Sequence, residues 1–263
     1  MYIAFCALSL AIFCELSLSH PDPFNFKPVH LFIFFSTLFT YNYHRLVYLK
    51  LAYRLNYLLV MMAFIFTVAS FLSFNGPSKY LSFVLGLVCL AYPLKLYQGK
   101  SLRSIPYFKT ALIAIVWAFA VVILPQLSHG HSAQYLFNNE QILFWFFFVM
   151  LFVFAEAFAF DIRDINNDRN TGLITLANSL GLQRSRVLNF LFFLLMAIGT
   201  LFSPLPQLWQ SPIIWSLLLT LFTGAALAVN INKERSKLYY SVGMESILIM
   251  PLIIFILTQL FLT

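Results

Sequence analysis

Nine long apolar runs, separated by short polar breaks, are the feature of this chain that most limits its fold. A helix needs about twenty apolar residues to cross the hydrocarbon of a bilayer, and somewhat fewer when flanking groups reach the surface. The runs lie near residues 2–18, 28–44, 56–74, 79–94, 107–125, 141–160, 187–203, 212–230 and 241–262. The breaks carry turn signals such as Asn75-Gly-Pro. The pattern predicts an all-α, polytopic membrane bundle of about nine transmembrane helices.

Composition supports lipid as the solvent. Hydrophobic residues make up 61% of the 263 residues and charged residues 10%, whereas a soluble domain has about a quarter of its residues charged. The length leaves no room for a separate soluble domain, so we expect one transmembrane domain over residues 1–263. The three cysteines, Cys6, Cys14 and Cys89, lie within apolar runs and are expected to be buried thiols.

The basic residues indicate an orientation. Fourteen of the 16 lysines and arginines fall in alternate breaks or at their edges, and the two exceptions are Lys27 and Lys79. Positively charged loops stay in the cytoplasm, so nine spans predict a cytoplasmic N-terminus and a C-terminus on the opposite side. We therefore interpret the net charge of +7 as an orientation signal and not as a nucleic-acid-binding surface. We expect a multi-pass protein of a bacterial inner membrane.

An acidic segment is the strongest candidate for chemistry. Three of the nine acidic residues, Asp161, Asp164 and Asp168, fall within eight positions at the end of an apolar run. Spacings of three and seven place them on one face of a helix. Mg²⁺ binds one or two carboxylates and fills its other positions with phosphate oxygens and water, and Arg163 is close enough to bind a phosphate. A solvated loop is the alternative, but the helical register favours a metal and phosphate site.

The segment that begins at Asp161 resembles the second aspartate-rich motif of the UbiA superfamily of intramembrane prenyltransferases. In that motif D-x-x-D-x-x-x-D-R is followed by a glycine, a T-L pair and L-G, and here these are Gly172, Thr175-Leu176 and Leu180-Gly181. The family's loop and helix between spans four and five also resemble three segments of this chain: Tyr92-Pro-Leu, Leu102-Arg-Ser-Ile-Pro and Trp117-Ala.

The resemblance implies a helical bundle around a central, lipid-open cavity. It implies transfer of an isoprenoid group from a prenyl diphosphate to a lipophilic acceptor, with membrane lipid around the site. It makes Asp161, Asp164 and Asp168 the catalytic residues and the ligands of Mg²⁺. A metal ion would neutralise the leaving diphosphate.

The family's first motif, N-D-x-x-D-x-x-x-D, is altered here. Asn42 is retained, but Tyr43, Leu46 and Lys50 stand at the three aspartate positions. No hard anionic ligand remains for a second Mg²⁺. In an active transferase, Lys50, Arg45 or His44 would replace the charge of the missing metal.

Alternatively, Lys50 would pair with an aspartate of the second motif and close the site. The protein would then be a non-catalytic, UbiA-like membrane subunit that binds lipid or a protein partner. Both interpretations stay open, and we favour the enzyme.

Further polar residues are candidates for the same site. Tyr92, Lys95, Lys100 and Arg103 are candidates to bind the diphosphate, although interface tyrosines are common and cytoplasmic loops carry topology-setting charges in any case. Glu156 lies within a span, where carboxylates are costly and often functional, and it is a candidate acceptor-binding group or base. His129 and His131 have no third ligand nearby in the sequence, and we interpret them as parts of a solvated loop.

Overall fold

The apolar runs form helices in the computed structural model, which describes residues 2–19, 26–49, 54–95, 101–202, 212–232, 234–236 and 238–262. No strand occurs within these ranges. In lipid, each backbone N–H and C=O must find its partner within the protein, and a helix provides these partners within a single segment. The all-α prediction is confirmed, and each of the nine apolar runs carries helix.

The long helices follow the predicted runs. They are α1 (Tyr2–Ser19), α2 (Pro28–Leu49), α3 (Arg54–Leu72), α4 (Gly76–Ala91), α5 (Phe108–Ala118), α8 (Glu140–Arg163), α11 (Leu182–Leu201), α13 (Pro212–Val229) and α14 (Met250–Leu262). Shorter elements connect or extend them: η1 (Leu102–Ser104), η2 (Phe119–Ile123), α6 (Leu124–Ser128), α7 (Ala133–Asn138), α9 (Ile165–Asn170), α10 (Leu176–Leu180) and η3 (Tyr239–Met244).

Several helices have the length and apolar character of membrane spans. Within the described residues, four stretches are long and apolar enough to cross a bilayer: Phe108–Ser128, Glu140–Arg163, Leu182–Leu201 and Pro212–Val229. Four further apolar helices are shorter: Tyr2–Leu18, Asn56–Leu72, Gly76–Ala91 and Met250–Leu260. The protein is a multi-pass membrane protein, while a total of nine spans stays a prediction.

Two irregularities follow from proline. Pro125 has no N–H to donate to the preceding turn, and the helix widens into the π-helical η2 just before it. The last predicted run, 241–262, is not one helix. It consists of the π-helical η3, a turn at Ile247–Ile249, and α14, whose second residue is Pro251.

The chain forms two compact units. The first consists of residues 1–103 and 118–146, and the second of residues 104–117 and 147–263. The helices α5 and α8 contribute to both units. A single domain over residues 1–263 stays a prediction.

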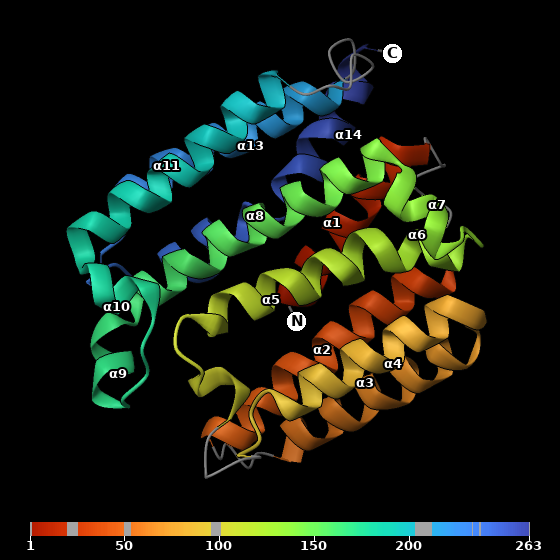
Figure 1. The fold of residues 1–263 in the computed structure, drawn as a ribbon, viewed down its shortest axis with the longest axis horizontal. Helices are drawn as coiled ribbons and strands as arrows, with labels where there is room; N and C mark the ends of the chain where they lie inside the picture. Colours follow the sequence, from red (N-terminus) through yellow and green to blue (C-terminus); the bar gives the residue numbers. More distant parts are fainter. Residues whose placement is uncertain are drawn as a thin grey trace. The chain divides into compact units, whose positions relative to one another are not determined.

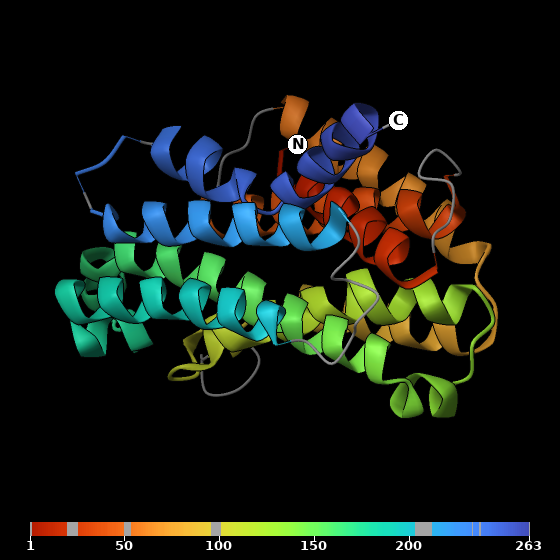
Figure 2. The same cartoon turned by 90° about the horizontal axis from the view of Figure 1, so that it is seen from above.

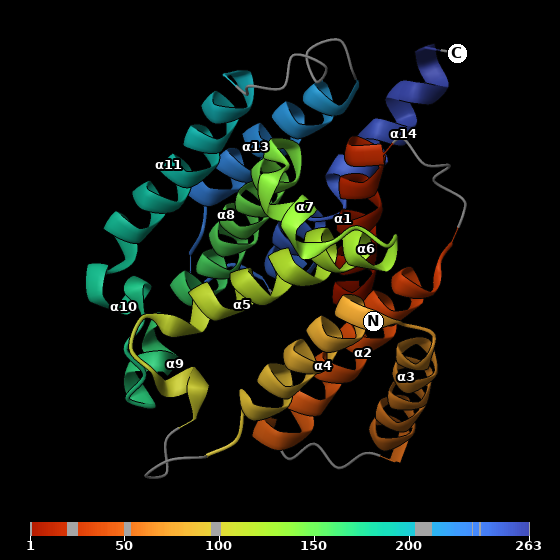
Figure 3. The same ribbon diagram turned by 45° about the vertical axis from the view of Figure 1, so that its right-hand side comes forward.

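In the first unit, α2 is the central helix. It packs against α1, α3 and α4, and Figures 1 and 3 show α2, α3 and α4 side by side. The small residues Ala4 and Ala63 allow α1 and α3 to approach Leu38 of α2 closely. The three cysteines lie in described helices and form no disulfide; Cys6 and Cys14 are buried, as expected, and Cys89 is half-buried.

A buried polar cluster ties three elements of the first unit together. The Glu15 carboxylate accepts hydrogen bonds from His30 at the start of α2 and from His129 at the end of α6. Glu15 is 3% exposed. The prediction that His129 belongs to a solvated loop is therefore wrong, because its imidazole faces a buried carboxylate. His131 stacks on Tyr135.

In the second unit, α13 lies along α11 and also packs against α14. Figure 2 shows α11 in cyan beside α13 in light blue. The two helices approach closely at Gly224, where a Cβ atom would lie 2.6 Å from Cε1 of Phe193. Phe193 is fully buried. Gly224 thus makes room for an aromatic ring that fills the interface.

Candidate functional site

The acidic segment is a nearly continuous helical stretch at the end of α8. Asp161 lies in the last turn of α8, Asp164 at the junction, and Asp168 in α9. The backbone N–H of Asp164 donates to the carbonyl of Phe160 at 3.0 Å, and that of Asp168 to the carbonyl of Asp164 at 2.8 Å. These two hydrogen bonds maintain the helical path, so the seven-residue spacing returns Asp168 to the side of Asp161.

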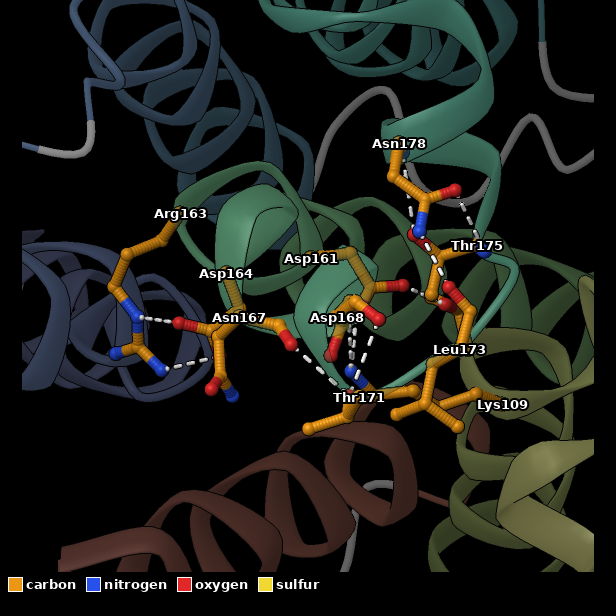
Figure 4. Close-up of polar contacts among 11 residues, drawn as sticks. Lys109, Asp161, Arg163, Asp164, Asn167, Asp168, Thr171, Leu173, Thr175 and Asn178 are labelled. Atoms are coloured by element: carbon orange, nitrogen blue, oxygen red, sulfur yellow. Dashed lines mark hydrogen bonds and ion pairs between the residues drawn. The ribbon is translucent and has the colours of Figure 1, made fainter.

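Lys109 joins the two outer aspartates. Its Nζ lies 2.7 Å from Oδ1 of Asp161 and 3.3 Å from Oδ2 of Asp168, as Figure 4 shows. The side chains of Asp161 and Asp168 are 3% and 0% exposed, and that of Lys109 is 13% exposed. The hydroxyl of Thr110 donates to the other oxygen of Asp161. The first turn of α5 therefore supplies the partners of both carboxylates.

Asp164 has a different partner. Its two oxygens accept hydrogen bonds from Nε and Nη2 of Arg163 at 2.7 and 2.8 Å, and its side chain is 31% exposed. The Arg163 guanidinium lies over the rings of Phe160 and Tyr240, at 4.9 and 5.2 Å from their centroids. The prediction that all three aspartates share one helix face is therefore correct for Asp161 and Asp168 but wrong for Asp164.

The family-like tail after the aspartates holds this segment in place. Leu173 N–H donates to the carbonyl of Asp168 at 2.8 Å, after a turn in which Gly172 has a φ of +72° that favours glycine. Thr175 and Asn178 form a reciprocal capping box at the start of α10. The N–H of Tyr107 donates to the carbonyl of Ile174 at 3.0 Å, which fixes the tail beside the start of α5.

In the sequence, Lys109 is predicted only as one of the basic residues at the edges of the breaks that set the orientation. A usable signal was present, because Lys109 begins an apolar run and an ionised side chain inside a membrane helix needs a counter-charge. The choice of Asp161 and Asp168 as that counter-charge depends on tertiary contacts between residues more than 50 positions apart.

The altered first motif lies in the first unit. Asn42 donates its side-chain amide to the carbonyl of Leu38 at 2.7 Å, within its own helix. Tyr43 stacks on Phe39 with centroids 5.8 Å apart. The sequence contains no Asp or Glu between Asp22 and Glu140. No carboxylate from this stretch is available to a metal.

The remaining candidates of the first unit are spread over several elements. Arg45 is exposed, with its guanidinium 5.8 Å from the Tyr41 ring centroid. Tyr92 is buried, and its carbonyl accepts from the N–H of Arg103 at 3.4 Å. Lys95 is exposed. Their part in a diphosphate site stays a prediction. Two further candidates, Lys50 and Lys100, lie outside the described residues.

Glu156 lies inside α8, five residues before Asp161. It is 5% exposed, and its Oε1 has no hydrogen-bond partner among the described residues. Glu245 and Arg163 are near enough to interact with it electrostatically. A buried carboxyl group of this kind is a candidate to bind a polar group of a ligand.

Two carboxylates of the segment fit a cation at one shared position. Asp161 and Asp168 both face the Lys109 ammonium, which is a stand-in for such a cation. Two carboxylates with phosphate oxygens and water are a donor set that suits Mg²⁺. No group of three His, Cys, Asp or Glu side chains converges for a metal in the described parts of the chain. A contribution of Asp164 to a shared metal stays a prediction.

Comparisons with known proteins bear on the fold and the family of the chain. The chain is similar in structure to the apo form of a UbiA homolog from Aeropyrum pernix K1, with a TM-score of 0.73 and 15% sequence identity. The match covers 97% of this chain and 98% of that one, and it shows a shared fold. No curated protein is significantly similar in sequence. The profile of the UbiA prenyltransferase family matches residues 44–244. With most of its length matched, the chain belongs to the UbiA prenyltransferase family.

Proposed function

We propose that this protein transfers a prenyl group from a prenyl diphosphate to a lipophilic acceptor, with Asp161 and Asp168 as the anchor of the diphosphate. The observation that carries the proposal is the convergence of these two buried carboxylates on one cationic position. Buried carboxylates are costly in a membrane protein and mark functional sites. Family membership supports the general reaction, since its members are prenyltransferases.

The reaction breaks the C–O bond between the prenyl group and the diphosphate. The diphosphate leaves with the bonding electrons, the allylic cation is captured by the acceptor, and the acceptor then loses a proton. Mg²⁺ bound with the diphosphate would neutralise the leaving group. Thr110 keeps Asp161 oriented, and Arg163 and Lys109 supply positive charge beside the aspartates. Glu156 is our candidate for the group that binds the acceptor or takes its proton.

The proposal is tested on purified protein in lipid nanodiscs. Prenyl diphosphates of increasing chain length are incubated with Mg²⁺, and pyrophosphate release is measured. Asp161→Asn and Asp168→Asn should each lower the rate by about 100-fold or more, because each removes a charged anchor of the leaving group. Glu234→Gln, which removes an exposed carboxylate elsewhere, is the matched control and should retain the rate of the unmodified protein.

A non-catalytic membrane subunit that binds lipid or a protein partner is the second candidate. It is favoured by the altered first motif, where Asn42 bonds to its own helix and Tyr43 stacks on Phe39. In that case the protein would bind prenyl diphosphates without releasing pyrophosphate from any of them. Asp161→Asn would then leave cellular function intact.

A further inference from the structure

We propose that Lys109 is an exchangeable counter-cation. Its ammonium neutralises Asp161 and Asp168 in the ligand-free protein and moves to the diphosphate when Mg²⁺ and diphosphate bind together. This inference rests on the proposed function, because it takes a diphosphate as the ligand. It predicts that the site does not bind a divalent ion by itself.

Lys109 occupies the position between the two aspartates that a shared metal ion would take. Nζ of Lys109 lies 2.7 and 3.3 Å from one oxygen of each aspartate. A Mg²⁺ ion shared by both carboxylates would lie about 2.0–2.1 Å from an oxygen of each, so it would need the space between them that the ammonium occupies. A divalent ion and an ammonium repel each other strongly at such distances. The metal can therefore enter between Asp161 and Asp168 only if Lys109 leaves.

The charges of the site also disfavour a divalent ion that binds without a diphosphate. Among the described residues, two carboxylates and one ammonium give a net charge of −1, and their side chains are 0–13% exposed. If Mg²⁺ replaced the ammonium, the metal would neutralise both carboxylates and Lys109 would lose its partners. A buried, unpaired ammonium is costly. A diphosphate removes this cost because its oxygens bind both the metal and the displaced ammonium.

The lysine is able to move, whereas the two aspartates are held in place. Asp161 is held by the Thr110 hydroxyl as well as by Lys109. The backbone of Asp168 is held by its hydrogen bonds with Asp164 and Leu173. Lys109 instead ends a flexible four-carbon chain that can turn to a new partner. The carboxylates can thus stay in place while the ammonium moves.

The experiment measures Mn²⁺ binding by electron paramagnetic resonance, using the full chain in nanodiscs with and without inorganic pyrophosphate. Mn²⁺ accepts the same oxygen ligands as Mg²⁺. The unmodified protein should take up Mn²⁺ only when pyrophosphate is present. Lys109→Met should take it up without pyrophosphate, at least about tenfold more tightly than the unmodified protein, because the competing charge is gone.

Two further variants complete the design. Lys109→Gln also removes the charge but keeps a polar side chain, and it replaces Lys109→Met if that variant does not elute as a single species. Lys79→Met removes a lysine that lies over the Phe71 ring in the first unit, and it should behave like the unmodified protein.

The role of Lys109 would be overturned if, without pyrophosphate, the unmodified protein and Lys109→Met bound Mn²⁺ equally. That result would not contradict the proposed transferase activity. If no protein bound Mn²⁺ even with pyrophosphate, and no prenyl diphosphate released pyrophosphate, both proposals would fail.

Discussion

Glu15 and His129 are hydrogen-bonded to each other although 114 positions separate them in the sequence. The same carboxylate binds His30, whose Nδ1 accepts the backbone N–H of Lys27 at 3.1 Å. This bond places the proton of a neutral His30 on Nε2, where it is donated to Glu15. The Lys27 ammonium lies 3.3 Å from Nδ1 of His129. The cluster joins the end of α1 to the start of α2 and the end of α6.

Replacing Glu15 with alanine should destabilise the first unit. The change leaves two imidazoles without their shared acceptor, and leaving buried hydrogen-bond donors without a partner costs about 1–3 kcal/mol each. We expect a lower thermal unfolding temperature in detergent. Glu140→Gln removes an exposed carboxylate and is the control, and equal unfolding temperatures for both variants would contradict the role of this cluster.

Adding one methyl group at Gly224 should weaken the contact between α11 and α13. The new Cβ would collide with the buried Phe193 ring, and overpacking of this kind costs about 1–3 kcal/mol. Gly199→Ala in α11 has open space for its Cβ and should leave stability unchanged or raise it by up to about 1 kcal/mol. In a double-mutant cycle measured by thermal unfolding, Phe193→Leu should recover part of the stability that Gly224→Ala loses. Purely additive effects of the two substitutions on stability would refute the contact.

The aspartates of the acidic segment should fall into two groups. Asp168→Asn weakens a fully buried ion pair, so we expect a loss of about 2 kcal/mol in stability. The paired Asp164 is partly exposed, and Asp164→Asn should cost less than about 1 kcal/mol. Pyrophosphate affinity, measured by calorimetry, should fall more in Asp168→Asn than in Asp164→Asn. The opposite order would show that Asp164 is the principal ligand.

Removal of divalent ions should have different effects on the free and the bound protein. With Lys109 as counter-cation, a chelator should leave the unfolding temperature of the ligand-free protein unchanged. The same chelator should abolish pyrophosphate binding, and added Mg²⁺ should restore it. A drop in the unfolding temperature of the ligand-free protein on chelation would mean that a metal, and not Lys109, neutralises the aspartates.

The orientation of the chain is also open to measurement. The alternating basic breaks predict a cytoplasmic N-terminus and a C-terminus on the opposite side. Reporter fusions that are active on one side of the membrane only should therefore give opposite results at the two ends. The same result at both ends would mean an even number of spans and would rule out nine.

The sequence predicted the helices better than it predicted the site. Helix positions follow from runs of apolar residues, a local property. The predicted break at Asn75-Gly-Pro is found at Asn75, while Gly76 and Pro77 already begin α4. The break before Pro251 was missed, although proline is itself a local signal. The aspartates were identified as the candidate site because their spacing is also local, but their partners come from α5 and from Arg163.

The sequence alone determined the membrane class, the positions of the helices and the acidic segment, because each of these depends on neighbouring residues. Only the tertiary structure decided what the segment binds in the free protein. Lys109 pairs with Asp161 and Asp168 because the tail at Ile174 holds the start of α5 beside α8 and α9. Asp164 turns to Arg163 instead. Such choices depend on distances between segments that are remote in the sequence, and the spacing of aspartates along one helix does not contain them.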